Sequence, residues 1–239
     1  MIDLHCHILC ALDDGAIDLE DSIAMARQAQ ADGIATVCAT PHVRVDHDVR
    51  VEQIAVRARA LQSSLDELGI AVRVLPGAEV AETEADSLSD ARLREACLGS
   101  GARWLLLEPA PGPIGDALQA LVGRLRQRRI DVVLAHPERH AGADFRERLG
   151  ALARDGCVIQ WTAQFIADCD PRGPIMALAR EGLVHVLGSD AHSSHGGRQL
   201  RLEHGFAALA AVRTPDQMAW SIERAPLAIV RGEPLEGAP

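Results

Sequence analysis

Short apolar runs rich in Val, Ile and Leu alternate with longer amphipathic stretches along the whole chain. This alternation is typical of parallel strands whose two faces are covered by helices. The pattern therefore predicts an α/β protein in which helices separate successive strands. The seven predicted strands are residues 2–7, 34–40, 72–80, 104–108, 131–136, 157–162 and 184–188.

The stretch after the first run carries the signals of a helix. Asp18 is a predicted N-cap, acidic residues follow it, and Gly33 marks the end. Seven strand and helix units favour a closed or nearly closed barrel, and this length suits one domain over residues 1–239. The segment after about Val230 is predicted to be a loosely held C-terminal tail.

Composition narrows the class of protein. The net charge of -10 argues against a nucleic-acid binder. All 24 basic residues are Arg. No apolar run reaches the roughly 20 residues that a membrane-spanning helix needs. The six cysteines form no CxxC pair, and no signal peptide precedes the first strand, so we expect a reduced, cytoplasmic protein.

Candidate chemistry gathers at the ends of the predicted strands. Catalytic groups of (β/α) barrels lie at the carboxyl ends of the strands, and six of the seven runs end in or just before a metal-capable residue. This set exceeds the three or four ligands that one ion requires. Its members are His5, His7, Asp14, His42, Glu79, Glu108, His136, Asp190 and His192.

Imidazole and carboxylate ligands together suit Mn, Fe or Zn. Strand alternation turns Cys6 away from His5 and His7, so we interpret Cys6 as a packing residue. The histidines away from the strand ends are interpreted as solvated or structural, and the role of His140 stays open. These histidines are His47, His185, His195 and His204.

The ordered segments MIDLHCHILCALDDG, ATPH, GAEV, LLLEP, AHPERH and GSDAHSS cover nearly the whole chain. In them the sequence resembles the polymerase and histidinol phosphatase (PHP) superfamily, and within it the manganese-dependent tyrosine phosphatases of bacterial capsule and exopolysaccharide synthesis. The resemblance implies a distorted (β/α)7, TIM-like barrel with a trinuclear metal centre.

The resemblance also implies how the ligands divide. One ion would be held by His5, His7, Glu79 and Asp190, a second by Glu79, Glu108 and His136, and a third by Asp14, His42 and His192. Asp13 is an alternative to Asp14. Arg139 would face the substrate phosphate without touching a metal, Arg198 is a weaker match to a second such arginine, and His42 or His192 could assist proton transfer.

The implied reaction is attack of a metal-bridging hydroxide on a phosphomonoester, with two to three divalent ions as the cofactor, most naturally Mn. The implied substrate is a phosphotyrosine protein, such as a tyrosine kinase of capsule or exopolysaccharide synthesis. Alternatives are a histidinol-phosphate or other small-molecule phosphatase, an amidohydrolase, a proofreading exonuclease and a non-catalytic regulatory barrel. The amidohydrolase alternative is weakened because the chain has no lysine to bridge two metals.

Two C-x5-R spacings imitate the loop of cysteine-dependent tyrosine phosphatases. They run from Cys38 to Arg44 and from Cys97 to Arg103. The first contains Pro41, which lacks an N–H to bind phosphate, and the second leads from a helix into a strand rather than the reverse. We therefore predict that neither thiol is a nucleophile.

Overall fold

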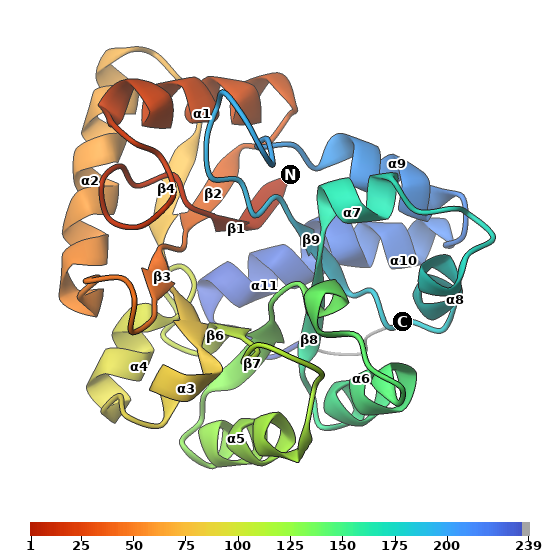
Figure 1. The fold of residues 1–239 in the computed structure, drawn as a ribbon. Helices are drawn as coiled ribbons and strands as arrows, with labels where there is room; N and C mark the ends of the chain where they lie inside the picture. The colour runs from red at the N-terminus through yellow and green to blue at the C-terminus, as the bar shows by residue number, and fades with distance from the viewer. Residues whose placement is uncertain (236–239) are drawn as a thin grey trace.

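A curled parallel β-sheet forms the centre of the molecule in the computed structural model, which describes residues 1–235 (Figure 1). The strands are β1 (Ile2–Cys6), β2 (Thr36–Ala39), β3 (His42–Val43), β4 (Arg73–Pro76), β5 (Glu79–Ala81), β6 (Trp104–Glu108), β7 (Asp131–Leu134), β8 (Val158–Thr162) and β9 (Val186–Gly188). They pair in the orders β1-β2-β4 and β3-β5-β6-β7-β8-β9, always in parallel. The expected α/β class is confirmed.

Helices follow most of the strands and pack outside the sheet, as Figure 1 shows. They are α1 (Leu19–Ala31), α2 (Val51–Glu67), α3 (Glu82–Ala85), α4 (Asp90–Ala96), α5 (Asp116–Gln127), the 3-10 helix η1 (Pro137–His140), α6 (Phe145–Arg154), α7 (Ala163–Ala167), α8 (Pro174–Arg180), α9 (Glu203–Ala210), α10 (Pro215–Ala219), the π-helix η2 (Trp220–Arg224) and α11 (Ala225–Arg231). The predicted cap of the first helix is confirmed, because the Asp18 side chain accepts from Asp21 N.

Two of the seven predicted strands are interrupted. The second run yields β2 and, beyond Pro41, the short β3, since proline has no N–H for the ladder. The third run breaks between β4 and β5 at Gly77, where an added Cβ would lie 2.8 Å from the Leu98 side chain. These breaks offset His42 and Glu79 from the strand segments that precede them, yet both residues pair in register across β3 and β5.

The first strand also meets the segment that follows β9. Cys6 forms a parallel bridge with Ala191, Asp190 N donates to His5 O at 2.8 Å, and His7 N donates to Ala191 O at 2.9 Å. This contact brings the first and last strands of the sheet together. It therefore places ligand candidates from both ends of the chain side by side.

The core has an outer and an inner part, as alternation along β6 illustrates. Leu105 and Leu107 pack in the outer cluster with the helices, whereas Trp104 and Leu106 pack in the inner cluster. The inner cluster also contains residues of η2 and α11, so these last helical turns close the amino ends of the strands. The helices η2 and α11 therefore do not cover the carboxyl ends of the strands.

The phase of β1 changes along its length. Ile2 and Leu4 pack with the inner cluster, whereas Cys6 packs with the outer one. The register of β1 against β2 shifts between Asp3 and Cys6. Because such an irregularity re-aims the following side chains, Cys6 turns outward and His5 and His7 face the interior. The packing role predicted for Cys6 is confirmed.

The segment after Val230 makes contacts with the sheet at its start, and the looseness predicted for the tail stays a prediction. Trp104 Nε1 donates to Glu233 O at 2.9 Å, and Leu235 packs against the inner cluster. Burial of Leu235 and the hydrogen bond from the Trp104 indole stabilise the contact of this segment with the sheet. The remainder of the predicted tail, residues 236–239, lies outside the described residues.

Within residues 1–235, no helix is both long and apolar enough to cross a membrane.

Candidate metal centre

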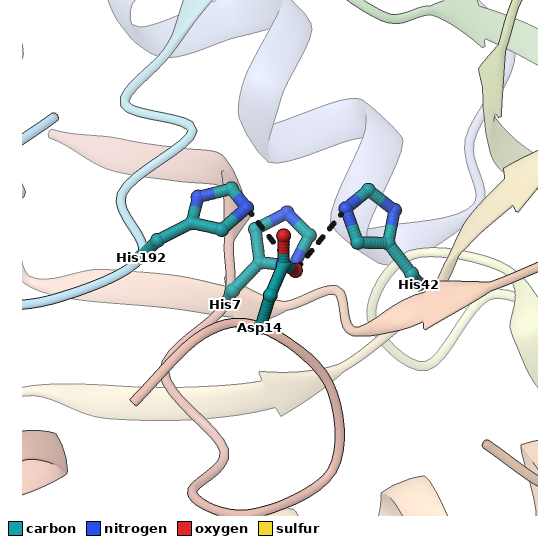
Figure 2. A group of neighbouring side chains, drawn as sticks. All are labelled: His7, Asp14, His42 and His192. Atoms are coloured by element: carbon teal, nitrogen blue, oxygen red, sulfur yellow. Dashed lines mark ion pairs between the residues drawn. The ribbon is translucent and has the colours of Figure 1, made fainter. Parts of the chain in front are cut away.

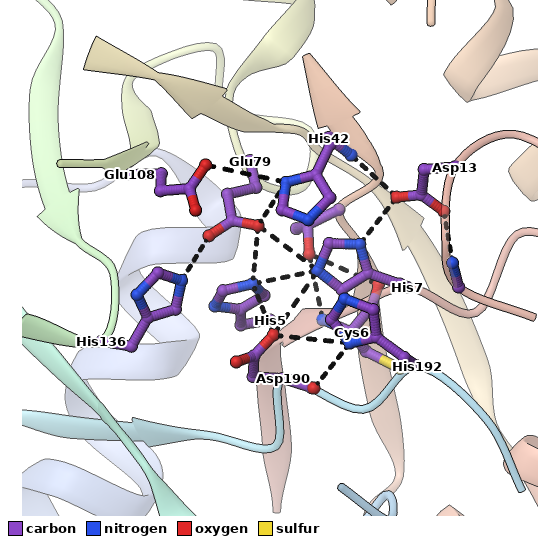
Figure 3. Close-up of polar contacts among 12 residues, drawn as sticks. His5, Cys6, His7, Asp13, His42, Glu79, Glu108, His136, Asp190 and His192 are labelled. Carbon is purple, nitrogen blue, oxygen red and sulfur yellow. Dashed lines mark hydrogen bonds and ion pairs between the residues drawn. The ribbon is translucent and has the colours of Figure 1, made fainter. Parts of the chain in front are cut away.

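The nine predicted ligands form one cluster at or just beyond the carboxyl ends of the strands. Figure 3 shows eight of them, and Asp14 is drawn in Figure 2. Five of them are almost completely buried, with at most 1% exposure: His5, His7, Glu79, His136 and Asp190. His42 is 5% exposed, and Glu108, His192 and Asp14 lie nearer the surface, with side-chain exposures of 12%, 18% and 55%. The cluster therefore has a closed floor and an open rim.

Glu79 lies at the middle of the floor. Its Oε2 is 2.9 Å from His42 Nδ1, 3.2 Å from His5 Nε2 and 3.3 Å from His7 Nε2. Its Oε1 is 2.7 Å from His136 Nε2. Despite this crowding, neither Glu79 Oε2 nor His42 Nδ1 finds a well-oriented hydrogen bond among the described residues.

These spacings match the donor atoms of a metal site. Ligands about 2.1 Å from a tetrahedral ion lie roughly 3.4 Å from one another. His5 Nε2 and His7 Nε2 are 3.2 Å apart, and both are close to Glu79 Oε2. Buried nitrogen and oxygen atoms crowd around one point, and Glu79 Oε2 and His42 Nδ1 among them have no well-oriented hydrogen bond within the described residues. Such a set fits a shared cation, so the residues present suit the predicted metal.

The electrostatics of the floor favour cations. Burial alone would raise the pKa of Glu79, but the charges of His5 and His136 and the hydrogen bond of His136 hold it well below its usual range. Burial likewise opposes ionisation of Asp190, yet neighbouring histidines lower its pKa. Two ionised carboxylates thus face the same buried space.

A second group lies at the rim, drawn in Figure 2. Asp14 Oδ1 is 3.6 Å from His42 Nε2 and 3.6 Å from His192 Nε2. The His7 and His192 rings stack with centroids 3.9 Å apart. Single ligand atoms of these four residues all lie within 4.8 Å of one another, so the group could hold an ion.

The two neighbouring aspartates point to different tasks. Asp13 accepts from His7 Nδ1 at 2.7 Å and from the backbone N–H of His42 and Gly15, at 2.9 and 3.0 Å. Burial opposes the ionisation of Asp13, but the hydrogen bond and charge of His7 lead the effects that lower its pKa to about 2. Asp13 therefore orients His7 from the side of the ring away from the cluster, whereas Asp14 belongs to the rim group.

The ligand groups in the structure agree only in part with the sets that the resemblance implies. His5 and His7 gather with Glu79, as implied, and Asp190 Oδ1 lies 3.5 Å from His5 Nε2. The implied second set joins Glu108 to His136. In the structure Glu108 gathers with His42 and Glu79, and His136 gathers with His5 and Asp190.

Two of the candidate ligands have left-handed backbone conformations. His136 has φ of 26° and Asp190 has φ of 51°. Such angles are uncommon for residues other than glycine, and they concentrate where a site dictates the direction of a side chain. The conformations turn both side chains toward the same buried space.

Two arginines converge on one ligand candidate from different elements. Arg139 of η1 and Arg198 of the loop after β9 both pair with the Asp190 carboxylate, Arg198 Nε at 3.0 Å from Oδ2. Arg198 Nε also donates to the Asp190 carbonyl at 2.7 Å. Their side chains remain 39% and 34% exposed, so both guanidinium groups stand between the floor and solvent.

A third arginine and a further histidine lie beside the ligand cluster, although the sequence did not mark either as part of the site. Arg44 Nη1 lies 3.3 Å from Glu108 Oε2, and its guanidinium forks onto Asp46 at 2.6 and 3.0 Å. His47, interpreted from sequence as solvated or structural, stacks on His42 with centroids 5.2 Å apart. The only sequence feature that could have marked Arg44 and His47 is their position shortly after the strand β3.

Neither thiol of the C-x5-R segments is available as a nucleophile, as predicted. Cys38 and Cys97 are 0% and 2% exposed. Burial raises the pKa of the Cys38 thiol far above its usual value and that of Cys97 to about 12. Both thiols therefore stay protonated.

Two other histidines have structural partners. His185 is buried, and its Nδ1 accepts from Ile159 N at 2.8 Å, in agreement with a structural role. His140 Nδ1 bonds to Gly112 O at 3.0 Å, and its ring lies 6.2 Å from that of His136. His140 therefore borders the floor without joining any of the ligand groups.

Comparison with known proteins agrees with this geometry. The chain is 34% identical over 204 residues to the tyrosine-protein phosphatase YwqE of Bacillus subtilis, covering 81% of this chain and 78% of YwqE. It is 25% identical over 203 residues to the tyrosine-protein phosphatase CpsB of Streptococcus pneumoniae, covering 81% and 83% of the two chains.

Two solved structures have a similar fold. A crystal structure from work on YwqE and CpsB, described there as unique metal-dependent tyrosine phosphatases, superposes with a TM-score of 0.82 at 27% identity, covering 99% of this chain and all of the other. A β-aspartyl dipeptidase of Fervidobacterium islandicum shares the fold, with a TM-score of 0.55 at 13% identity over all of this chain and 77% of the other. Residues 1–223 match the family described as capsular polysaccharide synthesis, CpsB/CapC, and the chain therefore belongs to the CpsB/CapC family.

Proposed function

We propose that this chain is a metal-dependent phosphomonoester hydrolase that removes phosphate from phosphotyrosine in proteins. The observation that carries the proposal is Glu79 Oε2, fully buried and 2.9 to 3.3 Å from three histidine nitrogens without a well-oriented hydrogen bond. The tyrosine-protein phosphatase activity for which YwqE and CpsB are named supports the choice of substrate.

Roughly two to three ions would be held by the nine clustered residues, and Glu79 belongs to two of the ligand groups. A mixed set of imidazoles and carboxylates suits Mn, with Fe or Zn as alternatives. When bound, such ions supply acidified water and polarise the phosphoryl oxygens.

The arginines would bind and orient the phosphoryl group. Arg139 and Arg198 are held together by Asp190 and partly exposed. Guanidinium groups bind phosphate through paired, charge-assisted hydrogen bonds, which makes them suitable to neutralise charge that develops during transfer. A role of His42 or His192 in proton transfer stays a prediction, because both also belong to the ligand cluster.

The proposed physiological partner is a bacterial tyrosine kinase of capsule or exopolysaccharide synthesis, and the proposed location is the cytoplasm. The family description of capsular polysaccharide synthesis supports the pathway. No nucleic acid is involved in this proposal, since the net charge of -10 disfavours binding to phosphate backbones.

We further infer that residues 1–239 form one distorted (β/α)7 barrel. Counting β2 with β3 and β4 with β5 as interrupted strands gives seven strand positions. The bridge between Cys6 and Ala191 links the first position to the last. The continuous inner cluster beneath the ligands supports a single core.

A substrate panel tests the function. We expect the Mn-supplemented protein to hydrolyse phosphotyrosine peptides with a higher kcat/KM than phosphoserine peptides or histidinol phosphate, and EDTA to abolish the activity. A preference for histidinol phosphate would identify a small-molecule phosphatase of the PHP superfamily. Absence of turnover with every phosphoester, despite bound metal, would favour a non-catalytic regulatory barrel.

A further inference from the structure

One strand position supplies none of the nine ligand candidates. It is β8, which lies between β7 and β9. Its central residue, Gln160, is nevertheless fully buried and pairs in register with Val186 of β9. A buried amide at this position must find partners for both its oxygen and its nitrogen.

The partners of Gln160 determine which way its amide points. Nε2 donates to the Trp161 carbonyl at 2.8 Å, and a carbonyl can only accept. The amide oxygen is therefore the atom that faces His5 Nδ1, at 2.9 Å. Because that oxygen is an acceptor, Nδ1 of His5 must carry the proton.

A neutral imidazole with a proton on Nδ1 presents a lone pair at Nε2. Nε2 of His5 is the atom that faces the ligand cluster, 3.2 Å from Glu79 Oε2 and 3.5 Å from Asp190 Oδ1. The hydrogen bond on one side of the ring thus prepares the other side to bind a cation.

The local packing leaves little freedom for this arrangement. A Cβ added at Gly188 would lie 2.7 Å from Gln160 Nε2 and 2.8 Å from His5 Cβ. The backbone of β9 therefore presses the amide against the imidazole. His7, the partner of His5 in the first strand, is oriented in the same way by the Asp13 carboxylate at 2.7 Å.

We propose that Gln160 is a positioning residue that fixes the Nδ1–H tautomer of His5 and so directs Nε2 into the metal centre. The proposal rests on the metal centre of the proposed function. A neutral amide performs for His5 the task that a carboxylate performs for His7, without adding a third anion to the floor beside Glu79 and Asp190.

The test uses the full-length protein and three variants. Gln160→Leu removes the acceptor, Gln160→Glu keeps an acceptor for His5 but cannot donate to Trp161 O, and Gln164→Leu alters a glutamine that instead contacts Asp168 and His204 near the surface. The first readout is long-range 1H–15N NMR of metal-free protein with 15N-labelled histidine, in which His5→Gln identifies the His5 signals. The spectra are recorded at alkaline pH, where His5 is neutral, because Glu79 and Asp190 raise its pKa despite its burial. The second is Mn affinity, measured by competition with a fluorescent chelator.

We expect Gln160→Leu to lose the fixed Nδ1–H pattern of His5 and to bind Mn about 10- to 100-fold more weakly, as other outer-sphere substitutions do. Gln160→Glu should keep the pattern and bind Mn more tightly than Gln160→Leu, and Gln164→Leu should match the wild type in both readouts. An unchanged His5 tautomer and Mn affinity in Gln160→Leu would overturn the proposal. So would equal loss in the Leu and Glu variants, which would indicate packing rather than the acceptor.

Failure of the proposed function gives a different result. A wild-type protein that binds no Mn would overturn the metal centre. The tautomer of His5 in the metal-free proteins would still decide whether Gln160 fixes it.

Discussion

The two ends of the space inside the curled sheet both contain buried residues but differ in chemistry. At the carboxyl ends of the strands, His5 and Glu79 are 0% exposed. At the amino ends, Trp104 of β6 and Ile229 of α11 are 3% and 0% exposed, within an almost entirely apolar cluster. The floor at the carboxyl end is therefore as buried as the amino end, and the two ends differ in their side chains and in the open rim at the carboxyl end.

Hydrogen bonding shows what each end is built for. Glu79 Oε2, His42 Nδ1 and His136 Nδ1 are buried at the carboxyl end without partners in the described part of the chain. At the amino end the buried His185 receives a hydrogen bond from Ile159 N. Unpaired buried polar atoms cost stability, so the carboxyl end is arranged for binding, and the amino end supplies stability.

Among the variants proposed here, Glu79→Gln should have the largest effect, which is loss of function at the carboxyl end. The substitution keeps the shape of the side chain but removes the charge that faces three histidines, so we expect loss of bound metal and a fall in kcat/KM of more than about 10³-fold. Elemental analysis and phosphatase kinetics measure the two effects. Glu67→Gln, at an exposed position of α2, is the matched control. Retention of metal and activity in Glu79→Gln would contradict the central role of this carboxylate.

Arg139→Ala separates phosphate binding from metal binding at the same end. The guanidinium contacts a ligand candidate but is itself partly exposed, so metal content should stay unchanged while kcat/KM on an aryl phosphate falls about 10²- to 10³-fold. Arg146→Ala, whose side chain is 70% exposed, serves as the control. Loss of metal together with activity would mean that Arg139 braces the His136 loop instead, and near-full activity would make it a surface charge.

Ile229→Ala should lower the stability that the amino end provides and leave metal binding at the carboxyl end unchanged. Removal of a fully buried side chain in the inner cluster is expected to lower the free energy of unfolding by about 2 to 4 kcal/mol. Urea denaturation measures this effect, and metal content should stay at the wild-type value. Loss of metal in a folded Ile229→Ala protein would show that the two ends are not independent.

His185 should give the amino end a pH dependence. Burial, with a smaller effect of Arg213, lowers the pKa of His185 to about 4. The unfolded chain therefore binds the proton more readily, and the stability contributed by neutral His185 is complete above about pH 6.5 and lost as the pH falls toward 4. Between about pH 7 and 5, the wild type should lose about 2 kcal/mol more than His185→Asn in urea denaturation. Parallel curves for the two proteins would refute this contribution.

The smallest effect is expected at the cysteines. Cys38 belongs to the inner apolar cluster and Cys97 to the outer one, so Cys38→Ser and Cys97→Ser should keep kcat/KM within about twofold of the wild type while EDTA abolishes it. An inactive serine variant with EDTA-resistant wild-type activity would restore the thiolate mechanism.

The parts of this comparison differ in how far the sequence predicts them. The candidate ligands could be located because strand periodicity and the rule that barrel chemistry lies at carboxyl ends both act locally. The breaks at Pro41 and Gly77 were less visible, since a continuous apolar run looks the same with or without an interruption. Docking of Leu235 depends on a cavity under Trp104 that only the assembled sheet provides.

The supporting contacts of the site were hardest to predict. Gln160 and His5 are 155 positions apart, and no local pattern marks a glutamine in a buried strand as the partner of a particular imidazole. Arg44 reaches Glu108 across two strands. Such contacts depend on the three-dimensional arrangement of elements rather than on the period of any one of them.

The meeting of β1 with the segment after β9 has a consequence for how the molecule forms. Asp190 N reaches His5 O, so neither ligand is in place until a loop of nearly the whole chain has closed. Contacts of such long sequence separation slow folding, because the entropy of closing the loop is lost before the contacts form. During synthesis on a ribosome, the N-terminal histidines are therefore made first, but their site is incomplete until the last strand of the described chain, β9, has been made.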